Sequence, residues 1–294
     1  MSMKLEAKIK AGEFIVLGEL EPPKGSDFSI LLKNANLVKG RVDALVIPEM
    51  ANAVMKASSL AGCAYLQGHG FDTVMQACCR DRNRLALQAD MLGAAALGIQ
   101  SVMAVQGEDI TFGDHHQARA VNDLDLLELL GMLQTLGGGK DMAGIELQGP
   151  PPAFIVGTTF NAGAAGGALE VELAELQKKI DLGVRYIVTT PIFEPDRLKA
   201  VLKRIDTSRV AVIPTVLLLK SAGMARYIDR NIRHISIPPD TIQSIQKAGD
   251  KAYQCTKIAG ELVAAFREMG LAGTLISTIG WEDKLPQVLD IARL

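Results

Sequence analysis

Aromatic side chains are scarce in this sequence: they make up 4% of its residues, and Trp281 is the only tryptophan. A surface that stacks nucleic-acid bases needs more of them. Basic residues are not in excess either, because 31 Lys and Arg face 33 Asp and Glu, giving a formal net charge of −2. Nucleic-acid binding would need a basic face or stripe. We therefore expect small molecules and proteins as partners, and no nucleic acid.

Long hydrophobic runs are also missing. No stretch reaches the roughly 18 uninterrupted apolar residues of a membrane span. The first twelve residues lack the apolar core of a signal peptide. We expect a cytoplasmic protein that does not bind a membrane.

Cysteine and histidine are few and carry no ligand spacing. The cysteines are Cys63, Cys78, Cys79 and Cys255, without a CxxC pair, and the four histidines form no HxxxH or HExxH motif. Free cysteine packs as a small hydrophobe, so we expect four reduced, mostly buried thiols and no metal site. The sequence also contains no P-loop and no GxSxG motif.

What the sequence does contain is a regular alternation of short apolar runs with amphipathic runs. The strand-like runs are residues 14–20, 44–47, 73–78, 101–106, 154–160, 186–190, 210–217 and 274–279. Eight such runs alternating with helices predict an all-parallel sheet, and eight is the number that closes into a barrel. An open doubly wound sheet would carry a Gly-rich fingerprint after its first strand, where this chain has Glu21-Pro22-Pro23. We predict a single (β/α)8 TIM barrel over residues 1–294.

Two of the amphipathic runs illustrate the predicted helices. Residues 82–98 place Leu85, Leu87, Met91, Leu92, Ala95 and Leu97 on one predicted apolar stripe. Residues 169–182 are expected to turn Leu173, Leu176 and Ile180 inward, and Lys178 and Lys179 outward. A further helical segment, about 239–269, is expected between the seventh and eighth strands.

Two connections are long enough to suggest a function or mobility. Residues 108–121 follow the fourth strand, so they should lie at the carboxyl-terminal face, where barrel enzymes build their active sites. Residues 137–152 precede the fifth strand and should lie at the opposite face.

Glu19 is the most informative residue at a predicted strand end, because it interrupts an otherwise apolar run. Burial raises the pKa of a carboxyl group, which would let Glu19 hold a proton near neutral pH. Alternation sends Glu21 to the same side of the strand, where a second carboxylate would favour protonation further. The competing interpretation makes Glu19 the structural partner of a Lys or Arg.

Residues 80–84 form a charged cluster, Arg-Asp-Arg-Asn-Arg, at a strand-to-helix junction. Asp81 could cap the helix. The arginines could bind a phosphate near the helix start, or they could simply form salt bridges in solvent; the pattern leaves both open. Gln106-Gly107-Glu108-Asp109 places a glycine beside two acids after a strand, where a ligand can approach the backbone closely.

Several of these phrases, in order along nearly the whole chain, resemble the methylenetetrahydrofolate reductase family. They lie at residues 18–25, 76–84, 97–99, 106–108, 178–179, 190–193, 219–225 and 280–282. The phrases around Arg82-Asn83 and Gly223-Met224-Ala225 look like the short-chain branch found in anaerobic one-carbon metabolism.

The resemblance implies a flavin-bearing barrel, with FAD or FMN, that reduces 5,10-methylenetetrahydrofolate to 5-methyltetrahydrofolate. Glu19 matches the family's general acid, and Glu108 matches a position near the pterin and the flavin. The positions that match cofactor-binding residues are Gln76, Gln106, Gly107, Glu108, Ala120, Asn161, Glu172 and Lys179. Those that match substrate-binding residues are Glu19, Glu108 and Thr190.

This chain departs from the family's pattern at several of these places. Pro48 stands where the second strand commonly ends in Thr, and Gln76 stands where many members have His, although the short-chain branch tolerates Gln. Glu108 replaces Asp, Thr190 replaces a folate-contacting Gln, and Ala162 replaces the Pro of an Asn-Pro pair.

The short-chain branch often works beside an iron-sulfur and zinc subunit, so such a partner is implied here as the source of electrons. Two other functions stay open: a folate-binding paralogue without reductase chemistry, and a structural subunit of a one-carbon or electron-transfer complex. A homo-oligomer is also open.

Overall fold

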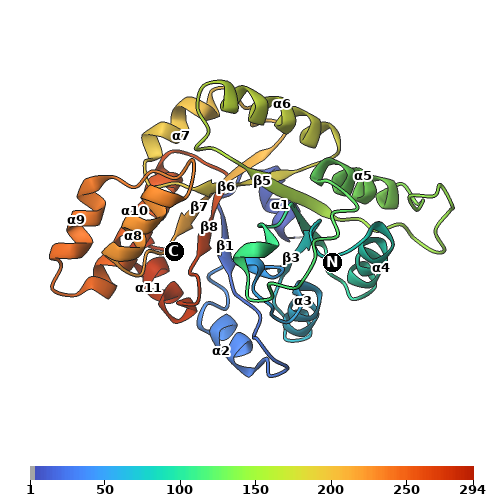
Figure 1. The fold of residues 1–294 in the computed structure, drawn as a ribbon, viewed down its shortest axis with the longest axis horizontal. Helices are drawn as coiled ribbons and strands as arrows, with labels where there is room; N and C mark the ends of the chain where they lie inside the picture. Colours follow the sequence, from blue (N-terminus) through green and yellow to red (C-terminus); the bar gives the residue numbers. More distant parts are fainter. Residues whose placement is uncertain (1–3) are drawn as a thin grey trace.

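The computed structural model describes residues 4–294, and its centre is a closed barrel of eight parallel strands (Figure 1). The strands are β1 (Ile15–Glu19), β2 (Ala44–Ile47), β3 (Thr73–Cys78), β4 (Ser101–Val105), β5 (Ile155–Phe160), β6 (Tyr186–Pro191), β7 (Ala211–Leu217) and β8 (Gly273–Ser277). Each pairs with the next, and β8 pairs with β1. The predicted (β/α)8 barrel is confirmed, with strand ends within two residues of those predicted. Residues 1–3 of the predicted domain lie outside the described residues.

Helices surround this barrel. They are α1 (Lys4–Ala11), α2 (Ser29–Leu37), α3 (Ser59–Gln67), α4 (Arg84–Ala96), α5 (Leu126–Gly137), α6 (Gly167–Asp181), α7 (Pro195–Leu202), α8 (Ala222–Asn231), α9 (Pro239–Lys247), α10 (Lys251–Glu268) and α11 (Leu285–Ala292), with short 3-10 turns η1 (Ala51–Ala53), η2 (Ile110–Phe112) and η3 (Glu282–Lys284). The predicted helical segment 239–269 is two helices, α9 and α10, and α8 precedes them after β7. No helix within residues 4–294 is long and apolar enough to cross a membrane.

The barrel lumen is filled by every second residue of the strands, as a parallel sheet requires. Ile15 and Leu17 of β1 belong to this inner cluster, which Leu5 of α1 closes at the amino-terminal end. Tyr186 of β6 also points inward and is completely buried. Its register partner on β5 is Gly157. The position requires glycine, because a β-carbon there would overlap the Tyr186 ring.

Helix α4 corrects the predicted apolar stripe on residues 82–98. Leu87 and Met91 are buried against the barrel, as predicted. Leu85, Leu92 and Leu97 are instead exposed, with relative exposures of 74%, 40% and 54%. The predicted apolar stripe therefore combined residues from two different faces of the helix.

Helix α6 corrects a second expectation. Leu176 and Ile180 face inward as predicted, and Lys178 is exposed. Lys179, which was expected to face solvent, is only 4% exposed. Its long apolar stem crosses the layer between helix and strand, which a pattern of charged letters does not reveal.

Candidate functional site

The lumen changes character at the carboxyl ends of the strands, where its side chains become polar. Glu19, Gln76 and Thr190 continue the inward-facing alternation of β1, β3 and β6. Thr159, the corresponding residue of β5, is exposed, so this end of the lumen is open to solvent. The structure therefore gathers these predicted site residues at the face where barrel enzymes carry out their chemistry.

Glu19 is held in this mouth by a single short hydrogen bond. Ser277 Oγ of β8 donates to Glu19 Oε1 at 2.5 Å. Burial raises the pKa of the Glu19 carboxyl above its usual value, and the negative charges of Glu282 and Glu108 raise it further. The Ser277 hydrogen bond and the charge of Lys56 act in the opposite direction but do not outweigh burial.

Glu21 does not crowd Glu19, contrary to the expectation from alternation. It forms an ion pair with Lys56, from the loop after η1. Glu19 itself makes no ion pair within residues 4–294, so the competing interpretation as a structural partner of Lys or Arg gains no support. The carboxylates that act on Glu19 are Glu108 and Glu282, from the loops after β4 and β8.

Arg80 ties the ends of three strands together. Its side chain is 3% exposed and forms an ion pair with Asp81 at 2.7 Å. It also donates to the backbone carbonyl of Met50 at 3.3 Å and to that of Glu108 at 3.2 Å. Because these carbonyls follow β2 and β4, Arg80 fixes both loops relative to the end of β3.

Gly107 lets the chain turn sharply beside Arg80. Its φ of +85° is a conformation that other residues rarely adopt, and a β-carbon there would lie 2.5 Å from Cys78 Sγ. Cys78 is buried, which raises the pKa of its thiol to about 11. Gly107 therefore packs against this unreactive thiol. The turn at Gly107 fixes the backbone position from which the Glu108 side chain extends.

The charged cluster at residues 80–84 differs from one of its predicted roles. Asn83, not Asp81, caps α4, by accepting a hydrogen bond from the Ala86 amide at 3.0 Å. Arg82 pairs with Glu49 at 2.9 Å, and Arg84 pairs with Asp123 at 3.0 Å. Since each arginine already has a carboxylate partner, the arrangement favours salt bridges over phosphate binding.

A second group of predicted residues lies where β5 meets α6. The backbone amide of Asn161 donates to Glu172 Oε2 at 3.3 Å. The Lys179 ammonium donates to the Thr159 carbonyl at 3.3 Å and lies 3.8 Å from a Glu175 carboxylate oxygen. These contacts place the three predicted residues together at one strand end, with Lys179 beneath the surface.

Three buried polar atoms at this end of the barrel have no hydrogen-bond partner within residues 4–294: Asn161 Oδ1, Thr190 Oγ1 and Thr278 Oγ1. Buried polar atoms are nearly always paired, so such a group calls for an explanation. Thr190 lies where the β6–β7 register shifts, between Val188 and Pro191. Irregularities of this kind often redirect a side chain near an active site.

The remaining predicted residues are less enclosed. Gln76 Oε1 accepts from the Glu49 amide at 3.1 Å, which joins the ends of β3 and β2. Gln106 and Ala120 are exposed. Ala120 precedes Val121, whose amide donates to the Arg80 carbonyl at 2.7 Å, so the long loop returns to the same cluster.

Three residues at the mouth were not singled out from the sequence for what they do here: Ser277, Lys56 and Glu282. Ser277 could have been found, because it continues the inward alternation of Leu275 in β8. Lys56 lies in the loop after η1 and Glu282 begins η3, and no local pattern connects either of them to Glu19.

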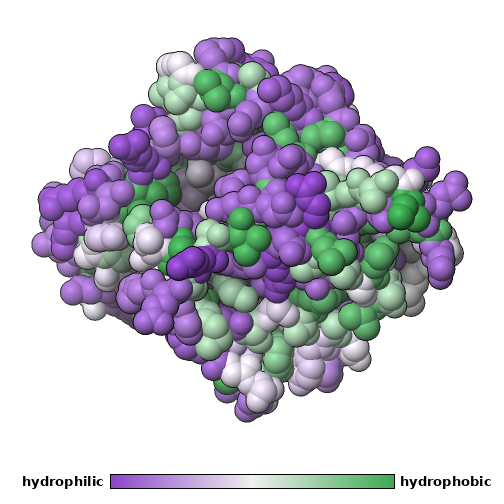
Figure 2. Space-filling view, turned by 45° about the vertical axis from the view of Figure 1, so that its right-hand side comes forward, coloured by the Kyte–Doolittle hydropathy of each residue, from purple (hydrophilic) through white to green (hydrophobic). Residues whose placement is uncertain are grey.

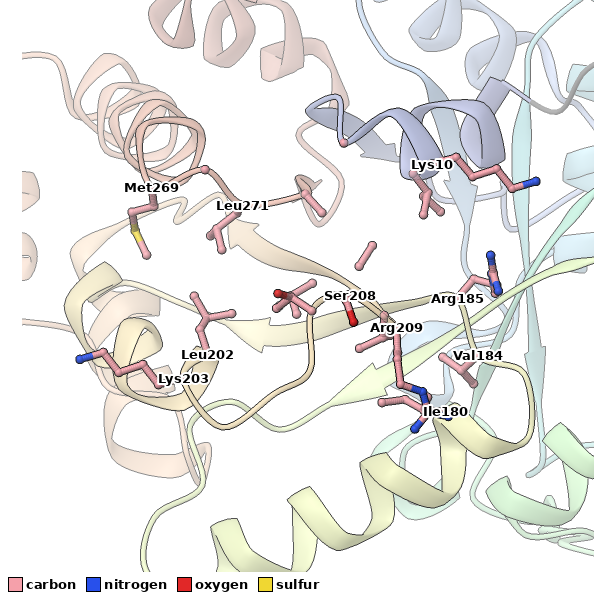
Figure 3. Close-up of a pocket in the computed structure, with 18 of the residues that line it drawn as sticks. Lys10, Ile180, Val184, Arg185, Leu202, Lys203, Ser208, Arg209, Met269 and Leu271 are labelled. Atoms are coloured by element: carbon pink, nitrogen blue, oxygen red, sulfur yellow. The ribbon is translucent and has the colours of Figure 1, made fainter.

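A hollow of about 860 Å³ lies at the opposite end of the barrel (Figure 3). Arg185 and Arg209, just before β6 and β7, line it together with Lys10 and Lys203. Arg209 is paired with Asp181 at 2.8 Å, and Lys10 with Glu6 at 2.7 Å. This hollow contains none of the predicted site residues.

Solved structures with similar architecture include EDTA monooxygenase (EmoA) from Chelativorans sp. BNC1, at a TM-score of 0.54 and 10% identity, covering 95% of this chain and 93% of that one. Another is 2,3-dimethylmalate lyase, a PEP mutase/isocitrate lyase superfamily member, at 0.55 and 12% identity, covering 100% and 83%. At such low identity the likeness concerns the fold alone.

No curated protein sequence matches the chain. The family model described as methylenetetrahydrofolate reductase, in contrast, matches residues 4–291, nearly the whole length. The matched region includes every strand of the barrel and every residue placed at its mouth. The chain therefore belongs to the methylenetetrahydrofolate reductase family.

Proposed function

We propose that this protein is a flavin-dependent reductase that converts 5,10-methylenetetrahydrofolate to 5-methyltetrahydrofolate with electrons from a partner subunit. The observation that carries the proposal is Glu19: a carboxyl group with a raised pKa at the open mouth of a barrel of this family. A reductase of this substrate needs a proton donor that is still protonated near neutral pH.

The proton has a defined destination in the proposed reaction. The methylene bridge joins two nitrogens, and protonating one of them opens the bridge to an electrophilic iminium carbon. Ser277 donates its hydrogen bond to Glu19 Oε1, which leaves Oε2 to carry the proton toward the substrate. Burial, and to a smaller extent the charges of Glu282 and Glu108, disfavour the ionised form of Glu19 and raise its pKa, so the neutral acid persists at higher pH than in a free glutamate.

The residues at the mouth fit a flavin and a folate. The unpaired Asn161 Oδ1 and Thr190 Oγ1 are acceptors that a ligand with N–H or O–H groups would satisfy. Gln76, Gln106, Gly107, Glu108, Ala120, Asn161, Glu172 and Lys179 are the residues that would hold the cofactor, and Glu19, Glu108 and Thr190 those that would contact the folate. A bound flavin supplies the hydride that the iminium carbon accepts.

Flavin binding is tested by loading the chain with excess FAD or FMN and measuring the visible absorbance that remains after gel filtration. The wild type should retain flavin. Lys179→Met keeps the apolar stem but removes the cation that faces the end of β5. It should weaken flavin binding by about tenfold, because a charged hydrogen bond contributes roughly 1.5 kcal/mol or more.

Lys178→Met is the matched control, since Lys178 is the exposed neighbour on the same helix. It should retain flavin like the wild type. A wild-type chain that binds neither flavin would overturn the proposed reaction and favour the folate-binding paralogue. Equal retention by both variants would remove Lys179 from the cofactor site.

A partner subunit is expected to supply the electrons. The chain lacks a Gly-rich nicotinamide fingerprint after β1, and its sequence resembles a branch that works beside an iron-sulfur and zinc subunit. With NADH alone, the flavin-loaded chain should turn over slowly or not at all, and a co-purifying partner should restore turnover. Steady-state rates with and without that partner make the comparison, and brisk NADH oxidation by the isolated chain would contradict it.

A further inference from the structure

The hollow at the amino-terminal end of the barrel has walls of two kinds (Figure 3). On one side lie Arg185 and Arg209, from the segments that lead into β6 and β7. Across the hollow lie the apolar side chains of Leu202, Met269 and Leu271, from the end of α7 and the segment after α10. Its volume of about 860 Å³ is within the range of about 300–1,000 Å³ that small-molecule sites occupy.

Arg185 is held in place by its own backbone. Its amide donates to the Val156 carbonyl at 2.8 Å, and its carbonyl accepts from the Ala211 amide at 3.0 Å, so the residue is fixed between β5 and β7. The next residue, Tyr186, points into the barrel lumen, so alternation turns the Arg185 side chain the other way, toward the hollow. Within residues 4–294 that side chain forms no hydrogen bond or ion pair.

Arg209 contributes spare donors to the same wall. Its Nη2 donates to Asp181 Oδ1 at 2.8 Å, and the part of the chain that the structure describes offers its side chain no other acceptor. A guanidinium group has five N–H donors, so most of those of Arg209 are free. Two guanidinium groups with free donors suit the paired oxygens of a carboxylate or phosphate.

The charge of the wall has one sign. The residues that line the hollow include four cations and, among the described residues, no Asp or Glu: Lys10, Arg185, Lys203 and Arg209. Lys10 and Lys203 stand at the ends of α1 and α7, where a cation is favourable whatever the hollow contains. Arg185 lies four residues beyond the end of α6, so a helix end does not account for it.

The acids nearby do not cancel this charge at the wall. Two of the four cations are paired with acids that lie outside the wall. Asp206 is turned toward Ser208, whose amide and hydroxyl donate to it at 3.1 and 2.6 Å. Glu13 and Glu268 adjoin lining residues along the chain, but neither belongs to the wall. The other two cations are left without a carboxylate partner within residues 4–294.

Apolar side chains on the surface are not remarkable by themselves, because much of any protein's surface is apolar. In the space-filling view they gather in the lower right, and hydrophilic residues cover most of the rest (Figure 2). The apolar wall of the hollow differs because it is concave and faces two guanidinium groups.

We propose that this hollow binds a small organic anion, a molecule that carries a carboxylate or phosphate group on an apolar body. The anionic group would meet Arg185 and Arg209, and charge-assisted hydrogen bonds would fix its orientation. The apolar body would pack against Leu202, Met269 and Leu271, where its removal from water favours binding. A ligand with both parts fits the two walls, whereas an inorganic anion or an uncharged apolar molecule fits only one.

The proposed site is separate from the barrel mouth. It lies at the amino-terminal ends of β6, β7 and β8, whereas Glu19 and the residues around it lie at the carboxyl-terminal ends. Binding here needs neither flavin nor folate. The proposal is therefore independent of the proposed reaction, and its test keeps its meaning whether or not the chain reduces a folate.

Calorimetric titration of the full chain with 1-naphthyl phosphate, 1-naphthoate and inorganic phosphate tests the site. At least one of the two aromatic anions should bind, one per chain, with a dissociation constant on the order of 100 μM. Whichever binds more tightly identifies the preferred anionic group. Inorganic phosphate should bind at least about tenfold more weakly, because it buries no apolar surface. Prior loading with flavin should leave these affinities unchanged.

Arg185→Gln should weaken binding of the preferred aromatic anion by about tenfold, the scale for losing one charged hydrogen bond. Arg204→Gln is the matched control, since Arg204 is also exposed but pairs with Glu170 at 2.6 Å and does not line the hollow. It should bind like wild type. Met269→Gln should weaken binding of the aromatic anion and leave that of inorganic phosphate unchanged. Circular dichroism should be the same for all three variants.

Three results would each overturn the proposal. The first is a wild-type chain that binds neither aromatic anion saturably, or binds inorganic phosphate as tightly. The second is an Arg185→Gln variant that binds like Arg204→Gln. The third is binding that disappears when the chain is loaded with flavin, because the anion would then occupy the mouth.

Discussion

Glu19→Gln should lower folate reduction by about 100-fold or more, the usual scale for loss of general acid catalysis. The amide keeps the size of the carboxyl and can still accept the Ser277 hydrogen bond, but it has no acidic proton to deliver. Flavin binding and flavin reduction should remain near wild type, because neither needs that proton. Rapid-mixing measurements of the two half-reactions separate these effects.

The stability of the same variant distinguishes an acid from a structural carboxylate. The folded-state pKa of Glu19 is raised, so its contribution to stability is complete below the unfolded-state value and is lost as pH rises through the folded-state value. Glutamine has no such loss. The melting temperature of Glu19→Gln should therefore equal or exceed that of wild type, with the difference growing as pH increases.

A structural role for Glu19 predicts the reverse. If the carboxylate stabilised a buried cation, Glu19→Gln would lower the melting temperature at neutral pH and leave folate reduction largely intact.

Ser277→Ala is a useful companion variant. It removes the hydrogen bond that lowers the Glu19 pKa, so it should move the pH limit of folate reduction upward without abolishing activity.

Arg80→Met should destabilise the fold by about 3 kcal/mol, the scale for breaking a buried ion pair from one side. Arg80 is 3% exposed and Asp81 is 17% exposed, so Asp81 would keep a largely buried charge without its main partner. The carbonyls of Met50 and Glu108 would also lose a donor. Chemical denaturation gives the free energy of unfolding directly.

Arg84→Met is the matched control for that measurement. Arg84 also pairs with an aspartate, but its side chain is 49% exposed, and exposed ion pairs contribute about 1 kcal/mol or less. If Arg80→Met lost no more stability than Arg84→Met, Arg80 would not be the tie between the strand ends that its contacts indicate.

The barrel could be predicted from the sequence because each strand is a short apolar run buried on both faces. In the runs 44–47 and 73–78, for example, the predicted first and last residues of the strand are those of the structure. Glu19 could be singled out for the same reason: a carboxylate inside an apolar run is conspicuous. Its raised pKa follows from burial, which the run already implied.

Predictions failed where the outcome depends on direction or on distant contacts. The hydrophobic pattern of α4 did not distinguish Leu87, which packs inward, from Leu85, which faces solvent. The pattern of α6 did not show that Lys179 is buried. The partners of Glu19 were out of reach because Ser277 is 258 residues away along the chain.

The reaction itself is tested most directly by one anaerobic experiment on the wild-type chain. The flavin-loaded protein is reduced chemically, separated from excess reductant and mixed with 5,10-methylenetetrahydrofolate. Reoxidation of the flavin, with one 5-methyltetrahydrofolate formed per flavin, is the predicted result. A flavin that stays reduced while the folate is recovered unchanged would contradict the proposed function.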